Sequence, residues 1–206
     1  MQYGVQGKYK GLPFQTRAQL DWLPQNGRYE AAQEVQLPLV GSRRQSSVGV
    51  LTPQGLQPEI FLDRSRKEHS TTFDHASRTL RFSRSTETAA LPAATQDRVS
   101  VFFQLAGTLA AAPQRYAAGT RITIPTAGTR RVVPWTFVVR GKETLQLPAG
   151  RMSAIKLEHV NESNEDDLQT TLWLAPQLQY LPVRIRMLEE GGRDELDLTL
   201  QSHSTP

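Results

Sequence analysis

The four histidines are the residues of this chain best suited to bind a metal or to move a proton at neutral pH. They are His69, His75, His159 and His203. None of them lies at the helical spacing of a metal-binding motif such as H-E-x-x-H. The 206 residues include no cysteine, which excludes thiol catalysis, disulfides, iron–sulfur clusters and cysteine zinc sites. We therefore expect no metal site and no cofactor.

The acidic stretch Asn161–Asp167 is the second place where ligands for an ion gather in the sequence. Its oxygen-bearing side chains recur at suggestive intervals, but the stretch lacks the central glycine and the terminal glutamate of an EF-hand loop. We interpret it as a solvated hairpin tip, with weak calcium binding as the alternative.

Nucleophilic catalysis requires a serine, threonine or cysteine that is held beside a base. Ser100 is the candidate hydroxyl, but the chain has no G-x-S-x-G elbow, and neither a P-loop nor a G-x-G-x-x-G motif occurs. We expect no catalytic residues and predict that the protein is not an enzyme. A hydrolase is the contrary hypothesis, and it requires a histidine and a carboxylate that converge in a cleft.

Basic residues suggest a further chemistry, the binding of nucleic acid. Arg78, Arg81 and Arg84 surround Phe82, and a basic strand with an aromatic side chain is a feature of single-strand binders. Acidic residues interrupt these basic runs, however, and the formal net charge is only +4. We predict no nucleic-acid partner.

The elements that must position these residues are strands. Apolar and polar residues alternate over many short runs, most clearly at Leu196, Leu198 and Leu200, and such a pattern buries one face of an antiparallel sheet. Turn residues separate the runs about every ten residues, and Asn26–Gly27 is a strong hairpin signal. This spacing predicts about ten to twelve strands.

One segment has a helical pattern instead. Asp97 is a candidate N-cap, and the apolar residues Val99, Phe102, Phe103 and Ala106 fit one face of a helix. No run of about 18 apolar residues occurs, so we expect no transmembrane segment. The sequence predicts a mainly β protein with a single highly curved antiparallel sheet that approaches an open barrel, and one short α-helix near residues 97–110. We expect one all-β domain over residues 1–206, and a two-sheet sandwich is the alternative.

Five short motifs, in this order along the chain, resemble the family of exported bacterial proteins known as domain of unknown function 3108. They are Gly55–Leu56–Gln57–Pro58, Gln96–Asp97–Arg98–Val99–Ser100, Leu147–Pro148–Ala149–Gly150, Trp173–Leu174–Ala175–Pro176 and Leu181–Pro182–Val183–Arg184–Ile185. The resemblance covers about residues 3–202 and implies a strongly curved antiparallel sheet with a helix. It also implies export to the periplasm, although no leader is visible before Gln2. No catalytic residues come with it.

Aromatic residues on the predicted strands suggest a binding function. If they share one concave face, they line a pocket for an apolar ligand, and otherwise they fill the core. The candidates are Trp22, Tyr29, Trp135, Phe137 and Trp173 on strands and Phe102 on the helix.

We therefore predict a non-catalytic periplasmic binding or carrier module for an apolar or amphipathic ligand, such as a lipid or an acylated protein segment. The alternative is an envelope assembly or scaffold protein that acts through surface contacts with other proteins. Nothing in the sequence predicts an oligomeric state.

Overall fold

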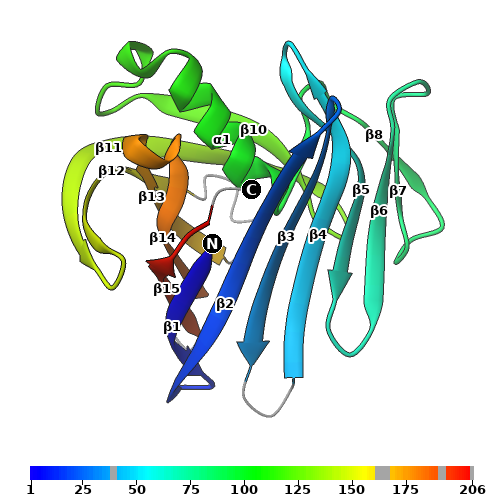
Figure 1. Ribbon diagram of the computed structural model, residues 1–206. Helices are drawn as coiled ribbons and strands as arrows, with labels where there is room; N and C mark the ends of the chain where they lie inside the picture. Colours follow the sequence, from blue (N-terminus) through cyan, green and yellow to red (C-terminus); the bar gives the residue numbers. More distant parts are fainter. Residues whose placement is uncertain (38–40, 161–167, 190–193, 205–206) are drawn as a thin grey trace. The chain divides into compact units, whose positions relative to one another are not determined.

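Strands make up most of the computed structural model, which describes residues 1–37, 41–160, 168–189 and 194–204 (Figure 1). One α-helix, α1 (Ser100–Ala111), and two short 3₁₀ helices, η1 (Pro113–Arg115) and η2 (Pro176–Leu178), are present in these residues. The strands are β1 (Gln2–Tyr9), β2 (Leu12–Gln25), β3 (Arg28–Leu37), β4 (Gly41–Thr52), β5 (Gly55–Arg64), β6 (Glu68–Asp74), β7 (Thr79–Phe82), β8 (Thr88–Ala90), β9 (Gln96–Asp97), β10 (Arg121–Ala127), β11 (Val132–Leu147), β12 (Gly150–Val160), β13 (Leu168–Ala175), β14 (Leu181–Glu189) and β15 (Glu195–Ser202).

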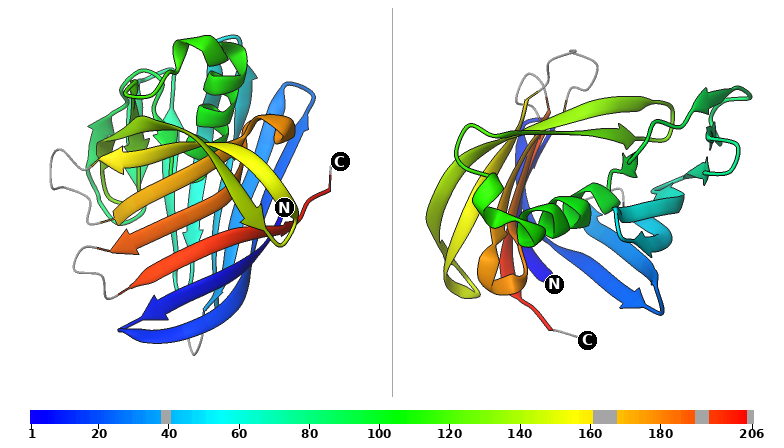
Figure 2. Two further views of the ribbon diagram at one scale, coloured as in Figure 1. Left: turned by 90° about the vertical axis from the view of Figure 1, so that its left-hand side faces the viewer. Right: turned by 90° about the horizontal axis from the view of Figure 1, so that it is seen from above.

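These strands form one sheet in the order β8-β7-β6-β5-β4-β3-β2-β1-β15-β14-β13-β12-β11-β10-β9. Most neighbours in the sheet are also neighbours along the chain, as in a meander. The main exception is the antiparallel pair of β1 and β15, which run side by side in both views of Figure 2. β9 and β10 form a short parallel pair. The prediction of a mainly β, mostly antiparallel fold with one short helix is confirmed.

The hairpin predicted at Asn26–Gly27 connects β2 and β3. Both residues have positive φ angles, 52° and 74°, as the central residues of a type I′ turn require. The structure has 15 strands among the described residues, more than predicted. The surplus includes β7, β8 and β9, which have four, three and two residues, too few for an alternating pattern to be detected. The predicted hairpin tip at residues 161–167 lies outside the described residues.

The chain divides into two compact units. The described residues of unit 1 fall within Met1–Ala18, Leu105–Thr123 and Trp135–Thr205, and those of unit 2 fall within Gln19–Gln104 and Ile124–Pro134. The prediction of a single domain stays a prediction.

The core of unit 1 is built from a row of apolar side chains that crosses six neighbouring strands. Register places these residues opposite one another from β11 to β1, and each is at most 2% exposed. The row is Val139, Leu157, Leu172, Ile185, Leu198 and Val5. Leu198, one of the alternating leucines of β15, is therefore part of a continuous packed layer.

The corresponding row of unit 2 includes hydroxyl side chains. It is Ala31, Ser47, Phe61, Thr71 and Phe82, each at most 5% exposed. The Thr71 hydroxyl donates to the Gly128 carbonyl at 2.8 Å, and the Ser47 hydroxyl donates to the Asp97 carboxylate at 2.5 Å. Both hydroxyl groups of this row are therefore hydrogen-bonded, as burial favours.

Helix α1 starts at the predicted cap. Asp97 is fully buried, and its Oδ1 accepts hydrogen bonds from the backbone N–H groups of Val99 and Ser100, each at 2.8 Å. These bonds satisfy N–H groups that have no partner within the helix. The helix continues past Gly107 to Ala111. None of the described helices is long and apolar enough to cross a membrane.

Candidate functional site

A cavity of about 550 Å³ opens on unit 2 beside the turn between β4 and β5. We call it the hairpin groove. Four segments form it: the end of the β4–β5 hairpin, the turn after β6, the segment that leads from β8 into β9, and α1 through Gln104. Its lining residues are Thr52, Gln54, Leu56, Gln57, His75, Arg78, Leu91, Pro92, Ala93, Ala94, Thr95, Gln96 and Gln104. The cavity volume is within the range of small-molecule sites.

The hairpin wall of the groove is fixed by a side-chain-stabilised turn. The Thr52 hydroxyl donates to the Gly55 carbonyl at 2.9 Å and accepts from the Gln54 N–H at 3.2 Å. Gly55 has a φ of 123°, where only glycine is comfortable. A Cβ at this position would lie 2.4 Å from the Gln104 side chain, so the glycine also allows α1 to approach the hairpin.

Two glutamine side chains hold Leu56 from the opposite side. Gln104 Oε1 accepts from the Leu56 N–H at 2.8 Å, and Gln96 Nε2 donates to the Leu56 carbonyl at 2.8 Å. The backbone N–H and carbonyl of Leu56 are therefore both hydrogen-bonded to side-chain amides, which take the place of the backbone amides of a neighbouring strand. Gln96 is 1% exposed, and its Oε1 has no hydrogen-bond partner among the described residues. A buried acceptor without a partner is unfavourable.

Two residues of the groove lining have strained backbone conformations. Ala94 and Arg78 both line it and have φ angles of 57° and 55°. This left-handed conformation costs about 1–2 kcal/mol for a residue with a Cβ. The Thr95 hydroxyl donates to the Pro92 carbonyl at 2.7 Å and closes the strained loop. Strained residues that the surrounding structure holds in place are a common feature of binding sites.

The groove has cationic and hydrogen-bonding groups in its lining but no acid. None of the described residues that line it is acidic, whereas the exposed Arg78 provides a positive charge. His75 Nε2 donates to the Pro58 carbonyl at 2.6 Å, which anchors the turn after β6 to β5. The groove therefore suits a ligand that combines an apolar part with a negative or hydrogen-bonding group.

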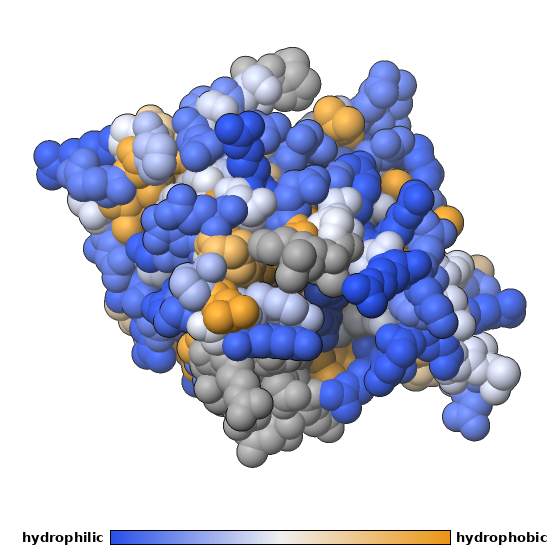
Figure 3. Space-filling model, turned by 90° about the horizontal axis from the view of Figure 1, so that it is seen from below, coloured by the Kyte–Doolittle hydropathy of each residue, from blue (hydrophilic) through white to orange (hydrophobic). Residues whose placement is uncertain are grey.

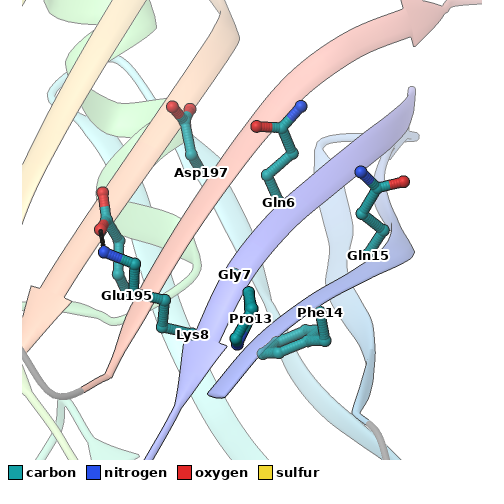
Figure 4. A pocket seen from close by; sticks show the side chains of 8 residues that line it. All are labelled: Gln6, Gly7, Lys8, Pro13, Phe14, Gln15, Glu195 and Asp197. Atoms are coloured by element: carbon teal, nitrogen blue, oxygen red, sulfur yellow. Dashed lines mark ion pairs between the residues drawn. The ribbon is translucent and has the colours of Figure 1, made fainter. Parts of the chain in front are cut away.

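A second cavity, of about 500 Å³, lies on unit 1 between β1, β2 and β15 (Figure 4). We call it the polar groove. Its acidic residues already have partners, because Glu195 is paired with Lys8 and Arg186 and Asp197 is paired with Arg184. These carboxylates form ion pairs within the unit. The polar groove therefore attracts a charged ligand less than the hairpin groove does, where Arg78 faces no acidic lining residue among those described.

Of the aromatic residues that the sequence analysis named in unit 2, two are brought together. Trp22 is half-buried and stacks on Tyr29, with ring centroids 5.3 Å apart, and on Phe103 at 4.4 Å. Tyr29 is 1% exposed and Phe102 is 3% exposed. These side chains pack in the core of unit 2, and none of them lines the hairpin groove.

In unit 1, Trp135 and Phe137 form an edge-to-face pair at 6.0 Å, and both rings contact His159. Trp173 is also buried, but it lies on the other face of the sheet, because its neighbours Leu172 and Leu174 point into the core. The ligand-binding role of all six aromatic residues stays a prediction.

The Trp173 ring lies beneath charged side chains. Lys156 Nζ is 5.7 Å and the Arg184 guanidinium 4.7 Å from its centroid, and its Nε1 donates to Glu143 at 2.8 Å. Cations over a tryptophan face are attracted to its π-system. Trp173 therefore joins a charged outer face on unit 1.

The remaining sequence candidates are dispersed. His159 is 7% exposed and packed among rings, His75 lies in the hairpin groove, and His203 is exposed. Among the described residues, no three histidines or acids cluster as a metal site would require. The stretch 161–167, named as the alternative calcium site, lies outside the described residues.

The groove itself has no signature in the sequence. Its apolar wall falls in the segment 87–95, which is rich in alanine, threonine and proline and indicates only a loop. The four glutamines of the lining have no periodic spacing, and their convergence depends on contacts between residues 40 and 48 positions apart. Two turn signals in the sequence, Pro53–Gln54–Gly55 and Asp74–His75–Ala76–Ser77, mark parts of its lining.

Comparisons with known proteins bear on the fold and the family of this chain, and they identify no functional residues. The chain is similar to a beta-barrel-like protein of the domain of unknown function DUF1849 from Brucella abortus, with a TM-score of 0.58 and 10% sequence identity. The match covers 97% of this chain and 93% of that one. At this identity the likeness shows the fold alone, and it confirms the predicted barrel-like architecture.

No curated protein matches the chain significantly. The family model described as protein of unknown function (DUF3108) matches residues 18–199, which is most of the chain. The predicted resemblance is thereby confirmed, and the chain belongs to the DUF3108 family.

Proposed function

We propose that this protein is a non-catalytic binding module of the periplasm that holds a small amphipathic ligand in the hairpin groove. One observation carries the proposal. The groove has apolar walls, and its lining residue Gln96 has a buried Oε1 without a hydrogen-bond partner in the described part of the chain, so a ligand that supplies a donor there would satisfy an unfavourable buried group.

The chemistry of the lining supports binding rather than catalysis. General acid–base work requires a base that can reach a nucleophile or a substrate proton. The histidine of the groove is tied through Nε2 to the Pro58 carbonyl, and none of the described lining residues is acidic. The periplasmic location rests on the export that the family resemblance implies.

The test is to fill the groove without disturbing the cores. Ala93 is exposed and lines the groove, so Ala93→Trp places a large ring in it. Ala110 is also exposed but lies outside the groove, and Ala110→Trp is the matched control. We expect isothermal titration with sodium octanoate, octyl glucoside and octylamine to detect binding of at least one of them to the parent and to A110W, but not to A93W. Absence of binding by all three, or equal binding by A93W, would contradict the proposal.

A second candidate is an envelope scaffold that acts through the charged outer face of unit 1. It is favoured by the network of charges around Trp173, in which Lys156 pairs with Glu158 at 2.9 Å and Arg140 pairs with Glu158 at 2.6 Å. Figure 3 shows the protein from below, where the hydrophobic groups of the coloured part are small and separated by hydrophilic ones.

The two candidates predict different effects of surface changes. If the scaffold candidate is correct, reversing an outer-face charge, as in Arg140→Glu, abolishes cross-linking to a partner in the periplasm, whereas A93W does not affect it. If the binding module is correct, A93W abolishes ligand binding and R140E leaves it unchanged.

A further inference from the structure

The hairpin groove carries enough detail to specify the class of its ligand. The inference rests on the proposed function, because it assigns chemistry to the same site. Three features of the lining each set one requirement: the charge, the unpartnered acceptor and the apolar wall.

Charge is the first requirement. Arg78 stands at the groove with an exposed side chain, and the described lining residues include no carboxylate to neutralise it. The nearby Asp74 is not part of the lining and accepts a hydrogen bond from the Ser77 N–H at 2.9 Å. A ligand with an anionic group is therefore favoured over a neutral or cationic one.

The unpartnered acceptor is the second requirement. The amide of Gln96 is oriented by its Nε2, which donates to the Leu56 carbonyl, so Oε1 is left as the acceptor without a partner among the described residues. An acceptor of this kind requires an N–H or O–H donor on the ligand, and a simple fatty acid anion has none.

The apolar wall is the third requirement. Leu56, Leu91, Pro92, Ala93 and Ala94 form it, and these side chains offer no polar atoms to a ligand. They suit a short alkyl chain or a small apolar side chain.

We propose that the hairpin groove binds an amphipathic carboxylate that carries an amide N–H, with the carboxylate at Arg78, the N–H directed to Gln96 Oε1 and the apolar chain along Leu91–Ala94. This is the chemistry of an N-acyl amino acid, and the carboxyl-terminal residue of a peptide shares it. Each group of the ligand thereby meets one of the three features of the lining.

Ligands that differ by one group test the proposal in isothermal titration. N-octanoylglycine carries all three features, N-octanoylglycinamide lacks the charge, and N-octanoylsarcosine lacks the N–H. We expect loss of the charge to weaken binding at least about tenfold and loss of the N–H to weaken it about fivefold. Equal affinity for N-octanoylglycine and its amide would overturn the proposal, as would equal affinity for the sarcosine compound.

Protein variants test the position of the ligand's carboxylate. Arg78→Gln should weaken the binding of N-octanoylglycine at least about tenfold. Arg84 is an exposed arginine outside the groove, so Arg84→Gln should leave this binding unchanged. Equal effects of the two variants would count against the carboxylate position. N-acetyl-Ala-Leu with a free carboxyl group distinguishes the source: tighter binding than N-octanoylglycine indicates a peptide end, and weaker binding indicates a free acylated amino acid.

Failure of this inference can be distinguished from failure of the proposed function. If octyl glucoside or octylamine binds the parent and not A93W, the groove is a binding site for a different class of ligand. If none of the amphipathic compounds binds, the proposed function itself fails.

Discussion

The carboxyl group of Asp97 is fully buried in unit 2. Three donors surround it: the Ser47 hydroxyl and the N–H groups of Val99 and Ser100. The Tyr29 hydroxyl in turn lies 3.0 Å from the Ser47 hydroxyl. Burial raises the pKa of the Asp97 carboxyl above its ordinary value, although these hydrogen bonds oppose the shift. The cap that starts α1 is therefore also a titrating group.

This raised pKa predicts how stability depends on pH. Because the folded state holds the proton more tightly than the unfolded state, where an aspartate titrates near pH 4, stability is lost as pH rises from about 4 through the folded-state pKa. One such proton contributes a slope of at most about 1.4 kcal/mol per pH unit. Asp97→Asn cannot ionise but keeps an oxygen for the two N–H groups, so we expect it to remove this slope.

Urea unfolding of the parent and D97N between pH 4 and pH 8 measures the difference. Asp74→Asn is the control, because a hydrogen bond from the Ser77 backbone lowers the pKa of Asp74. Asp74 therefore contributes stability above its unfolded pKa that is lost as pH falls, which is the opposite sign. Parallel curves for the parent and D97N would show that Asp97 does not titrate in this range.

At the scale of elements, two glycines with different surroundings predict opposite effects of the same change. A Cβ at Gly49 in β4 would lie 2.2 Å from the Gln57 carbonyl oxygen and 2.8 Å from Pro58 Cα. Both are backbone atoms of the neighbouring strand, so Gly49→Ala must push β5 away. We expect it to cost about 1–3 kcal/mol of unfolding free energy, as overpacking does.

Gly107 in α1 is exposed, and a Cβ there meets nothing within 4 Å. Gly107→Ala should stabilise the helix by about 0.5–1 kcal/mol, because alanine restricts the unfolded chain and favours helix. Thermal unfolding of both variants measures the change in stability, which we expect to be a loss for G49A and a gain for G107A. A stable G49A protein would mean that β4 and β5 are not packed this closely in solution.

Elements with a regular pattern were predictable from the sequence, and the hairpin groove was not. The Asn26–Gly27 turn, the Asp97 cap and the leucine alternation of β15 each depend on residues within a few positions of one another. The end of the helix predicted near residues 97–110 depends on more than local propensity: Gly107 is a poor helix former, yet the helix continues to Ala111, where the buried Leu109 supplies packing that propensity does not report.

The groove depends instead on contacts that no local pattern contains. Leu56 is bonded to Gln96 and Gln104, and these pairings form only when β5, β9 and α1 meet. Strand periodicity likewise predicts which side chains face inward, such as Tyr29 and Phe137, but not which cavities stay unfilled.

At the scale of the whole chain, the first and last strands complete one core. β15 lies between β1 and β14, and its Leu198 and Leu200 are at most 1% exposed. The Tyr3 hydroxyl of β1 donates to the Pro182 carbonyl at 2.6 Å, across 179 positions of sequence. Unit 1 therefore cannot finish its core until residues near both ends of the chain have met, and such distant pairings slow folding.

This topology predicts a sharp effect of a short truncation. Removing residues 195–206 deletes β15, so β1 and β14 each lose a neighbour and two buried leucines are lost. Burying each leucine contributes about 1.5–3 kcal/mol, so we expect unit 1 to lose several kcal/mol of its stability and the amides of β1 and β14 to exchange rapidly with deuterium. Removing only residues 203–206, which follow β15, is the control and should leave exchange in both strands unchanged. Slow exchange in β1 and β14 of the shorter chain would mean that these strands do not depend on β15 for their protection.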